Sequence, residues 1–104
     1  MARPIWTPDA VESLEAIAEY IARSSPGYAG PFLARIVDAT EMLEEFPWAG
    51  RTVPEFHVEA FREVIFQNYR IVYEVLDGRV WILLVVHGAV DLPAQLRKRG
   101  IAPS

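Results

Sequence analysis

The sequence predicts a single α+β domain over residues 1–104, in which a short N-terminal strand and two antiparallel helices pack on an antiparallel β-meander, with a short C-terminal helix. Two stretches with apolar residues at helical spacing come first, and three stretches rich in β-branched and aromatic residues follow them. A chain of 104 residues can bury one modest core and is too short for two domains.

The first helix is expected to begin after Thr7 as N-cap, with Pro8 in the first helical position and Asp9 near the positive end of the helix dipole. It should end near Arg23, and residues 3–6 suit a short strand before it. The apolar residues along its buried side are Ala10, Leu14, Ile17, Ala18 and Ile21.

The second helix has two candidate starting points, Ser25-Pro26 and Gly30-Pro31. A proline inside a helix costs about 3 kcal/mol, so we expect a loose first turn and regular helix from Pro31. Its apolar stripe is Phe32, Ile36, Ala39, Leu43 and Phe46.

Strands are expected in the second half of the chain, after a surface crossing rich in proline and glycine. Asp77-Gly78 is a strong hairpin turn, and Gln67-Asn68 is a second turn. The crossing covers residues 46–54, and the strands cover residues 61–66, 69–76 and 79–86.

Counting back from the Asp77-Gly78 turn pairs Leu76 with Arg79 and predicts the register of the last two strands. One face should receive the helices, because every pair on it is apolar. Those pairs are Val75 with Val80, Tyr73 with Ile82, Ile71 with Leu84, and Tyr69 with Val86.

The opposite face should carry an apolar strip that water would not cover, formed by Trp81, Leu83, Val85 and Val72. Either the C-terminal segment 91–99 or another protein should cover this strip, and the pattern favours neither. On this face the pairs are Glu74 with Trp81, Val72 with Leu83, Arg70 with Val85, and Asn68 with His87.

The same register places Arg70 diagonal to His87, roughly 7–8 Å apart at the backbone. Arg62 is a further candidate, and a one-residue slip at the Gln67-Asn68 turn would send it to the other face. Arginine can hold a phosphate and histidine can move a proton, which suits phosphoryl transfer. The structural alternative is an arginine paired with Glu63 or Glu74 and a histidine that only ends a strand.

Composition excludes several functions. There are no cysteines and only two histidines, so we expect no metal site and no cofactor, and His57 between Glu55 and Glu59 reads as a solvated loop residue. The net charge of −4 disfavours nucleic-acid binding outside a local basic run at residues 97–99.

Trp6 and Trp48 are expected to pack loops against the core. No apolar run spans a bilayer and the first residues lack a signal-peptide pattern, which predicts a cytoplasmic location.

Five segments, taken in order, resemble the RelE/ParE toxin superfamily over nearly the whole chain. The C-terminal stretch, residues 91–100, is closer to the ParE branch. The segments are Trp6-Thr7-Pro8-Asp9-Ala10, residues 14–21, Phe46-Pro47-Trp48-Ala49-Gly50-Arg51, Tyr69-Arg70-Ile71-Val72-Tyr73, and Val86-His87-Gly88-Ala89-Val90-Asp91-Leu92.

The resemblance implies the toxin of a bacterial type II toxin–antitoxin system, a system associated with plasmid stabilisation. A ParD-like antitoxin would neutralise the toxin in a hetero-oligomer and would be its only link to DNA. The ParE branch implies DNA gyrase as target, and the RelE branch implies ribosome-dependent cleavage of mRNA as the alternative. In a nuclease, Arg62, Arg70 and His87 would be catalytic, but Ala89 and Val90 replace arginines that relatives often carry after the His-Gly pair. The residues expected to contact protein partners are Trp81, Leu83, Val85, Val72, Leu96 and Arg97.

Overall fold

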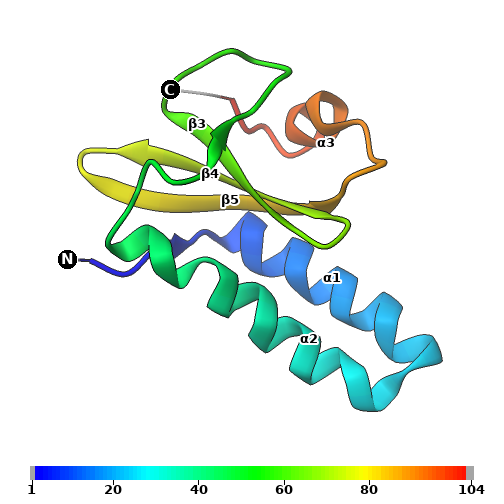
Figure 1. Ribbon diagram of the computed structural model, residues 1–104. Helices are drawn as coiled ribbons and strands as arrows, with labels where there is room; N and C mark the ends of the chain where they lie inside the picture. The colour runs from blue at the N-terminus through cyan, green and yellow to red at the C-terminus, as the bar shows by residue number, and fades with distance from the viewer. Residues whose placement is uncertain (1, 103–104) are drawn as a thin grey trace.

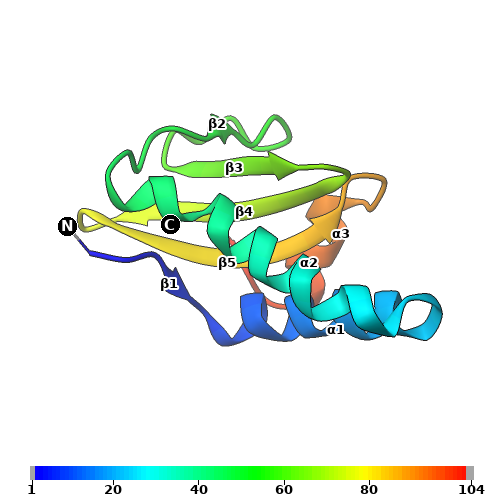
Figure 2. The ribbon, with the colours of Figure 1, turned by 60° about the horizontal axis from the view of Figure 1, so that its bottom comes forward.

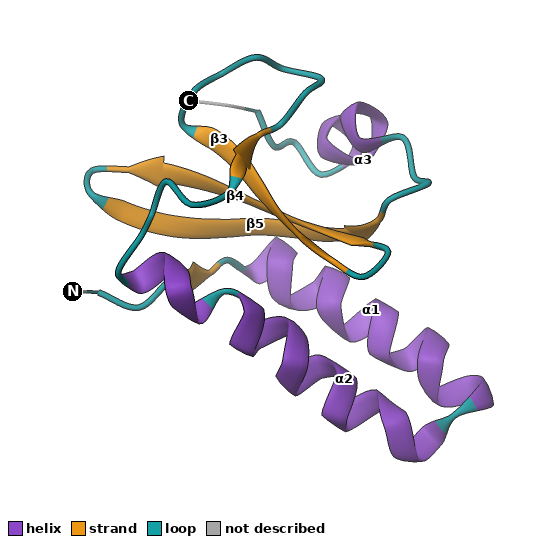
Figure 3. Cartoon of the chain, viewed as in Figure 1, coloured by secondary structure: helices purple, strands orange, loops and turns teal. Residues whose placement is uncertain are grey.

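The computed structural model describes residues 2–102 and consists of a five-stranded sheet with helices on both faces (Figures 1 and 3). The strand order is β1-β5-β4-β3-β2, and all neighbours are antiparallel except β1, which runs parallel to β5. The predicted fold class is confirmed, with β1 making the sheet mixed. The domain expected over 1–104 also includes residues 1, 103 and 104, which lie outside the described part.

The N-terminal strand β1 (Ile5–Trp6) leads directly into helix α1 (Pro8–Ser24), and Thr7 joins them. The Thr7 hydroxyl accepts a hydrogen bond from the Ala10 N–H at 3.2 Å, which caps the helix as predicted. The same hydroxyl donates to the Ile82 carbonyl of the sheet at 2.7 Å. One residue therefore fixes both the start of α1 and its position against the sheet.

Helix α2 (Pro26–Ala39) begins five residues earlier than predicted, with Pro31 inside it. Pro31 cannot donate to the Gly27 carbonyl, but Gly27 is exposed in the first turn, where water can take the place of the missing donor. The earlier start also brings the ring of Tyr28 to 5.7 Å from that of Phe32, centroid to centroid. The expectation of regular helix only from Pro31 was wrong.

The second helix also ends before its predicted stripe does. After Thr40, whose hydroxyl donates to the Val37 carbonyl at 2.7 Å, the chain tightens into the 3₁₀ helix η1 (Glu41–Glu44). Leu43 is still buried, but Phe46 is 60% exposed and lies outside the core.

Three longer strands form the middle of the sheet, between the edge strands β1 and β2. Strand β2 (Arg51–Thr52) lies within the predicted surface crossing. Both predicted turns form, and Gln67, Asp77 and Gly78 have positive φ angles of 52°, 52° and 71°. The longer strands are β3 (Phe61–Phe66), β4 (Tyr69–Leu76) and β5 (Arg79–His87).

The predicted register between β4 and β5 holds from the turn as far as the Tyr73–Ile82 pair and then fails. Leu83 is an extra residue on β5, so a β-bulge shifts every later pair by one. A shift of one residue exchanges the two faces of the strand beyond it. The observed pairs replace the five predicted beyond this point and are Val72 with Leu84, Ile71 with Val85, Arg70 with Val86, and Tyr69 with His87.

The bulge gives the sheet two apolar faces, each covered by this chain's own helices (Figure 2). Val85 packs with α1 and α2, and Val72 packs with Leu92 and Leu96 of helix α3 (Leu92–Lys98). The prediction that Val85 shares a strip with Val72 was therefore wrong, because the two lie on opposite faces. Both are buried within the chain, at 0% exposure for Val72 and 1% for Val85. Of the two covers considered, the C-terminal segment lies over this face.

Candidate functional site

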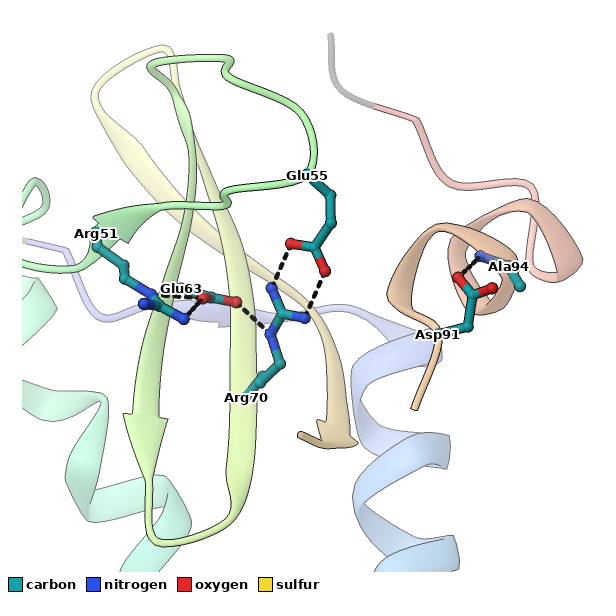
Figure 4. A network of polar contacts seen from close by, with 6 residues as sticks. All are labelled: Arg51, Glu55, Glu63, Arg70, Asp91 and Ala94. Carbon is teal, nitrogen blue, oxygen red and sulfur yellow. Dashed lines mark hydrogen bonds and ion pairs between the residues drawn. The ribbon is translucent and has the colours of Figure 1, made fainter. Parts of the chain in front are cut away.

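Arg70 lies in a network of charged side chains on the face of the sheet that carries α3 (Figure 4). Its Nη1 and Nη2 donate to the two carboxylate oxygens of Glu55, each at 2.7 Å, and its Nε donates to Glu63 at 2.7 Å. Arg51 donates to the other oxygen of Glu63 at 2.7 Å. The arginine thus has two carboxylate partners, one of them the Glu63 named as the structural alternative.

The electrostatics of this network favour the charged forms. Hydrogen bonds from Arg70 lower the pKa of the Glu55 carboxyl below its ordinary value, and burial opposes this only in part. Glu55 in turn raises the pKa of Arg70. Because the Arg70 charge is compensated twice over, little of it is left for an incoming phosphate.

Arg62 lies on the opposite face of the sheet, because it pairs with Tyr73 of the helix-facing side. Its guanidinium donates to three backbone carbonyls, those of Trp48, Gly50 and Glu59, at 3.2, 2.8 and 2.8 Å. It also lies 5.0 Å from the ring centre of Trp48. The structure therefore does not bring Arg62 together with Arg70.

His87 ends β5 and is exposed, with its ring against that of Tyr69 at 5.5 Å between centroids. Its Nδ1 accepts a hydrogen bond from the Ala89 N–H at 3.1 Å. The register shift puts His87 and Arg70 on opposite faces by strand alternation, yet both border a shallow cavity of about 420 Å³. Glu55 borders the same cavity, so the cavity contains the carboxylate that neutralises its arginine.

The six residues expected to contact partners differ widely in exposure. Arg97 is exposed, and Trp81 and Leu83 are half-buried. The Nε1 of Trp81 is buried and has no hydrogen-bond partner among the described residues. Val72, Val85 and Leu96 are buried within the chain itself, so they are not available to a partner in this conformation.

Sequence reasoning missed two features of the surface. One is a groove of about 410 Å³ between α1 and the α3 region, bordered by Ile17, Tyr20, Tyr69 and Val90. Its only sequence signal was Tyr20, an aromatic residue outside the apolar stripe of α1, and it is 68% exposed. The other is the exposure of Phe46 and of Trp48, which is 49% exposed where we expected it to pin a loop.

Residues 2–102 contain neither of two other kinds of site. No group of three His, Asp or Glu side chains within this range is placed to hold a metal ion. No helix within the same range is long and apolar enough to cross a bilayer.

Comparison with known proteins identifies the family. Residues 5–92 match the family model described as the ParE toxin of the type II toxin–antitoxin system parDE. The chain is 37% identical to toxin RelE2 of Caulobacter vibrioides over 86% of its length and 98% of that protein, and 32% identical to Y4kP of Sinorhizobium fredii over 88% and 93%. Its fold matches a chain of the chromosomal ParDE TA system from P. aeruginosa with a TM-score of 0.71 and 21% identity, over 84% of this chain and 96% of that one. The chain therefore belongs to the ParE toxin family of type II toxin–antitoxin systems.

Proposed function

We propose that this chain is a cytoplasmic toxin that acts by binding DNA gyrase, and that a ParD-like antitoxin neutralises it in a hetero-oligomer. The observation that carries the choice of a binding mechanism over RNA cleavage is the bidentate pairing of Arg70 with Glu55. The choice of gyrase rests on the ParE branch of the family, and the choice of cytoplasm rests on the location of that target.

Cleavage of RNA needs groups that hold a phosphate and move a proton at one place. Arg70 is neutralised by Glu55 and Glu63, and the guanidinium of Arg62 is bound to backbone carbonyls on the other face of the sheet. His87 alone remains exposed. The net charge of −4 also works against docking among the phosphates of a ribosome.

An antitoxin partner is supported by the groove between α1 and the α3 region. Its border is mostly apolar, with Ile17, Tyr69 and Val90 contributing beside the exposed Tyr20. A flexible amphipathic segment that folds as it binds would bury these side chains.

A supercoiling assay with purified protein tests the proposal. Inhibition of gyrase by the free toxin, relieved by adding the antitoxin, is the expected result, and expression in cells should cause filamentation and DNA-damage signalling without loss of mRNA. A toxin that leaves gyrase untouched but cuts mRNA at defined codons would overturn the proposal. A short adjoining reading frame with a ribbon-helix-helix start and an amphipathic tail would support the partnership.

The second candidate function is ribosome-dependent mRNA cleavage, and one observation favours it. Arg70 and His87 border the same cavity, as a nuclease of the RelE type would require. If this candidate is correct, His87→Ala and Arg70→Ala will each abolish mRNA cleavage in a protein that still folds. Arg70→Ala will also lower stability, because it removes the pairs with Glu55 and Glu63. Under the gyrase proposal, His87→Ala retains full inhibition of supercoiling.

A further inference from the structure

Exposed aromatic side chains lie together between η1 and β2, in a segment that contributes no side chain to either core cluster. Phe46 is 60% exposed and Trp48 is 49% exposed, and Met42 beside them is 45% exposed. We call Phe46, Pro47 and Trp48 the aromatic patch. Neither Phe46 nor Trp48 belongs to the two core clusters, so burial in the core does not explain their presence.

The backbone of the aromatic patch is held firmly in spite of this exposure. The buried Tyr73 hydroxyl donates to the Pro47 carbonyl at 2.8 Å and accepts from the Gly50 N–H at 2.9 Å. Arg62 donates to the carbonyls of Trp48 and Gly50 and stacks on the Trp48 ring. A Cβ on Gly50 would come within 2.6 Å of the Glu63 carbonyl oxygen, so the chain fits closely here.

A surface that is rigid before binding loses little conformational entropy when a partner arrives. Tryptophan and arginine are also the residues most enriched among those that dominate binding energy, and phenylalanine is enriched at interfaces. The aromatic patch has both a firmly held backbone and these residue types. Arg62 stacks on the Trp48 ring and donates a hydrogen bond to the Trp48 carbonyl. Its construction is that of an anchor for a protein partner.

The charges around the patch are the acidic side chains at η1 and the guanidinium of Arg62, which lies against the Trp48 ring and is held by backbone carbonyls. The acidic side chains indicate the chemistry of the partner on their side of the patch. Glu41 and Glu45 are exposed at η1, immediately before the patch, and Glu45 borders a shallow apolar hollow of about 480 Å³ with Phe46 and Trp48. A complementary surface would offer an apolar pocket for the aromatic rings with basic side chains at its rim.

The aromatic patch also lies away from the α1–α3 groove. Pro47 borders a hollow with Val80 near the start of β5, whereas His87 at the end of β5 borders the groove. The groove extends back along β5 to Leu84, and a rise of about 3.3 Å per residue separates Val80 from Leu84 by roughly 13 Å. In Figure 2 the β4–β5 turn lies on the left and α3 on the right.

We propose that the aromatic patch binds the folded target of the toxin, through an apolar pocket with a basic rim on that target. The inference rests on the proposed function, in which the target is gyrase. A patch with a firmly held backbone suits a pocket that is already formed, whereas a flexible antitoxin segment suits the groove.

The test compares two double variants in binding to the intact gyrase enzyme and to the antitoxin. Phe46→Ser with Trp48→Ser removes the patch, and Tyr28→Ser with Val37→Ser removes two exposed apolar side chains from α2, which are 42% and 39% exposed. Thermal unfolding checks that both remain folded. We expect the patch variant to bind gyrase at least ~30-fold more weakly and the α2 variant to bind within about threefold of wild type.

The binding results separate the inference about the patch from the proposed function. Unchanged gyrase binding by the patch variant, with wild type bound, overturns the inference and leaves the proposed function standing. A loss of antitoxin binding with gyrase binding unchanged would overturn the inference and assign the patch to the antitoxin. A loss of self-association in sedimentation with gyrase binding unchanged would assign the patch to a second copy of this chain. A wild-type toxin that does not bind gyrase overturns the proposed function and the inference with it.

Discussion

Arg70 and Glu55 are joined by two parallel hydrogen bonds of 2.7 Å, one from each terminal nitrogen of the guanidinium to each carboxylate oxygen. This fork-to-fork geometry is the strongest that an arginine and a carboxylate can adopt. It ties the loop before β3 to strand β4, and it occupies the donors that a nuclease would aim at a phosphate. The pair is therefore structural in this chain, and its removal should be visible in stability before it is visible in toxicity.

Glu63→Gln should destabilise the protein more than Glu55→Gln. The Glu63 side chain is 0% exposed and serves both Arg51 and Arg70, so its loss leaves a largely buried Arg70 undercompensated, at a cost of about 3 kcal/mol. The Glu55 side chain is 32% exposed, so water can solvate the groups that lose their partner, and Glu55→Gln should lower the free energy of unfolding by about 1 kcal/mol. Urea unfolding monitored by tryptophan fluorescence measures both, and a larger effect for Glu55→Gln would contradict the assigned roles.

Stability should fall at acid pH partly through Glu55. Its folded-state pKa is lowered from 4.5, chiefly by hydrogen bonds from Arg70, so folding favours the ionised form. The stabilisation is fully present above pH 4.5 and is lost as pH falls through the lower folded-state pKa. The difference in unfolding free energy between wild type and Glu55→Gln should be constant from pH 7 to pH ~5 and should shrink below that. A difference that persists unchanged at pH ~3 would rule out this role of the carboxylate.

Tyr73→Phe should cost about 2 kcal/mol, because the hydroxyl bonds two backbone groups at once, the buried Gly50 N–H and the partly buried Pro47 carbonyl. Without it, the Gly50 N–H and the Pro47 carbonyl both lose their partner. Differential scanning calorimetry measures the loss, and amide exchange should show faster exchange at Gly50 than at Val64 in the middle of β3. Retention of the wild-type melting temperature would mean that water replaces the hydroxyl fully.

Local signals in the sequence were enough for most of the fold. Thr7 was predicted as a helix cap from its own side chain and the turn that follows it, and Asp77-Gly78 forms its turn from backbone preference alone. Pairs next to that turn were correct because register propagates from it. The resemblance to the RelE/ParE superfamily rested on segments in their order and did not depend on the register.

The prediction of the candidate site failed where the strand register depends on packing between distant parts of the chain. Leu83 has no side-chain property that marks it as a bulge, because Leu83, Leu84, Val85 and Val86 are all apolar and either register buries them. Two contacts made elsewhere in the fold select the observed register. Helix α3 packs against Leu84 and Val86, and the Ser13 hydroxyl of α1 accepts a hydrogen bond from the Val85 N–H at 3.0 Å. The pairing of Arg70 with Glu55 was equally invisible, since it depends on how the loop before β3 folds back over the sheet.

Deletion of Leu83 should leave the fold intact, whereas deletion of a residue inside a regular strand should disrupt it. Removing the bulged residue keeps Tyr73 opposite Ile82 and Val72 opposite Leu84, so no later side chain changes face. The loss should be about 2 kcal/mol, since a half-buried leucine and a local bend disappear. The matched control is deletion of Val64, which is also half-buried and lies in β3, a strand without a bulge. Deleting one residue there must move the side chains at one end of β3 to the opposite face of the sheet. Urea unfolding and a nuclear Overhauser contact between Ile71 and Val85 report on both variants. If the Leu83 deletion unfolds as readily as the Val64 deletion, the bulge itself is required for the twist that brings α3 onto the sheet.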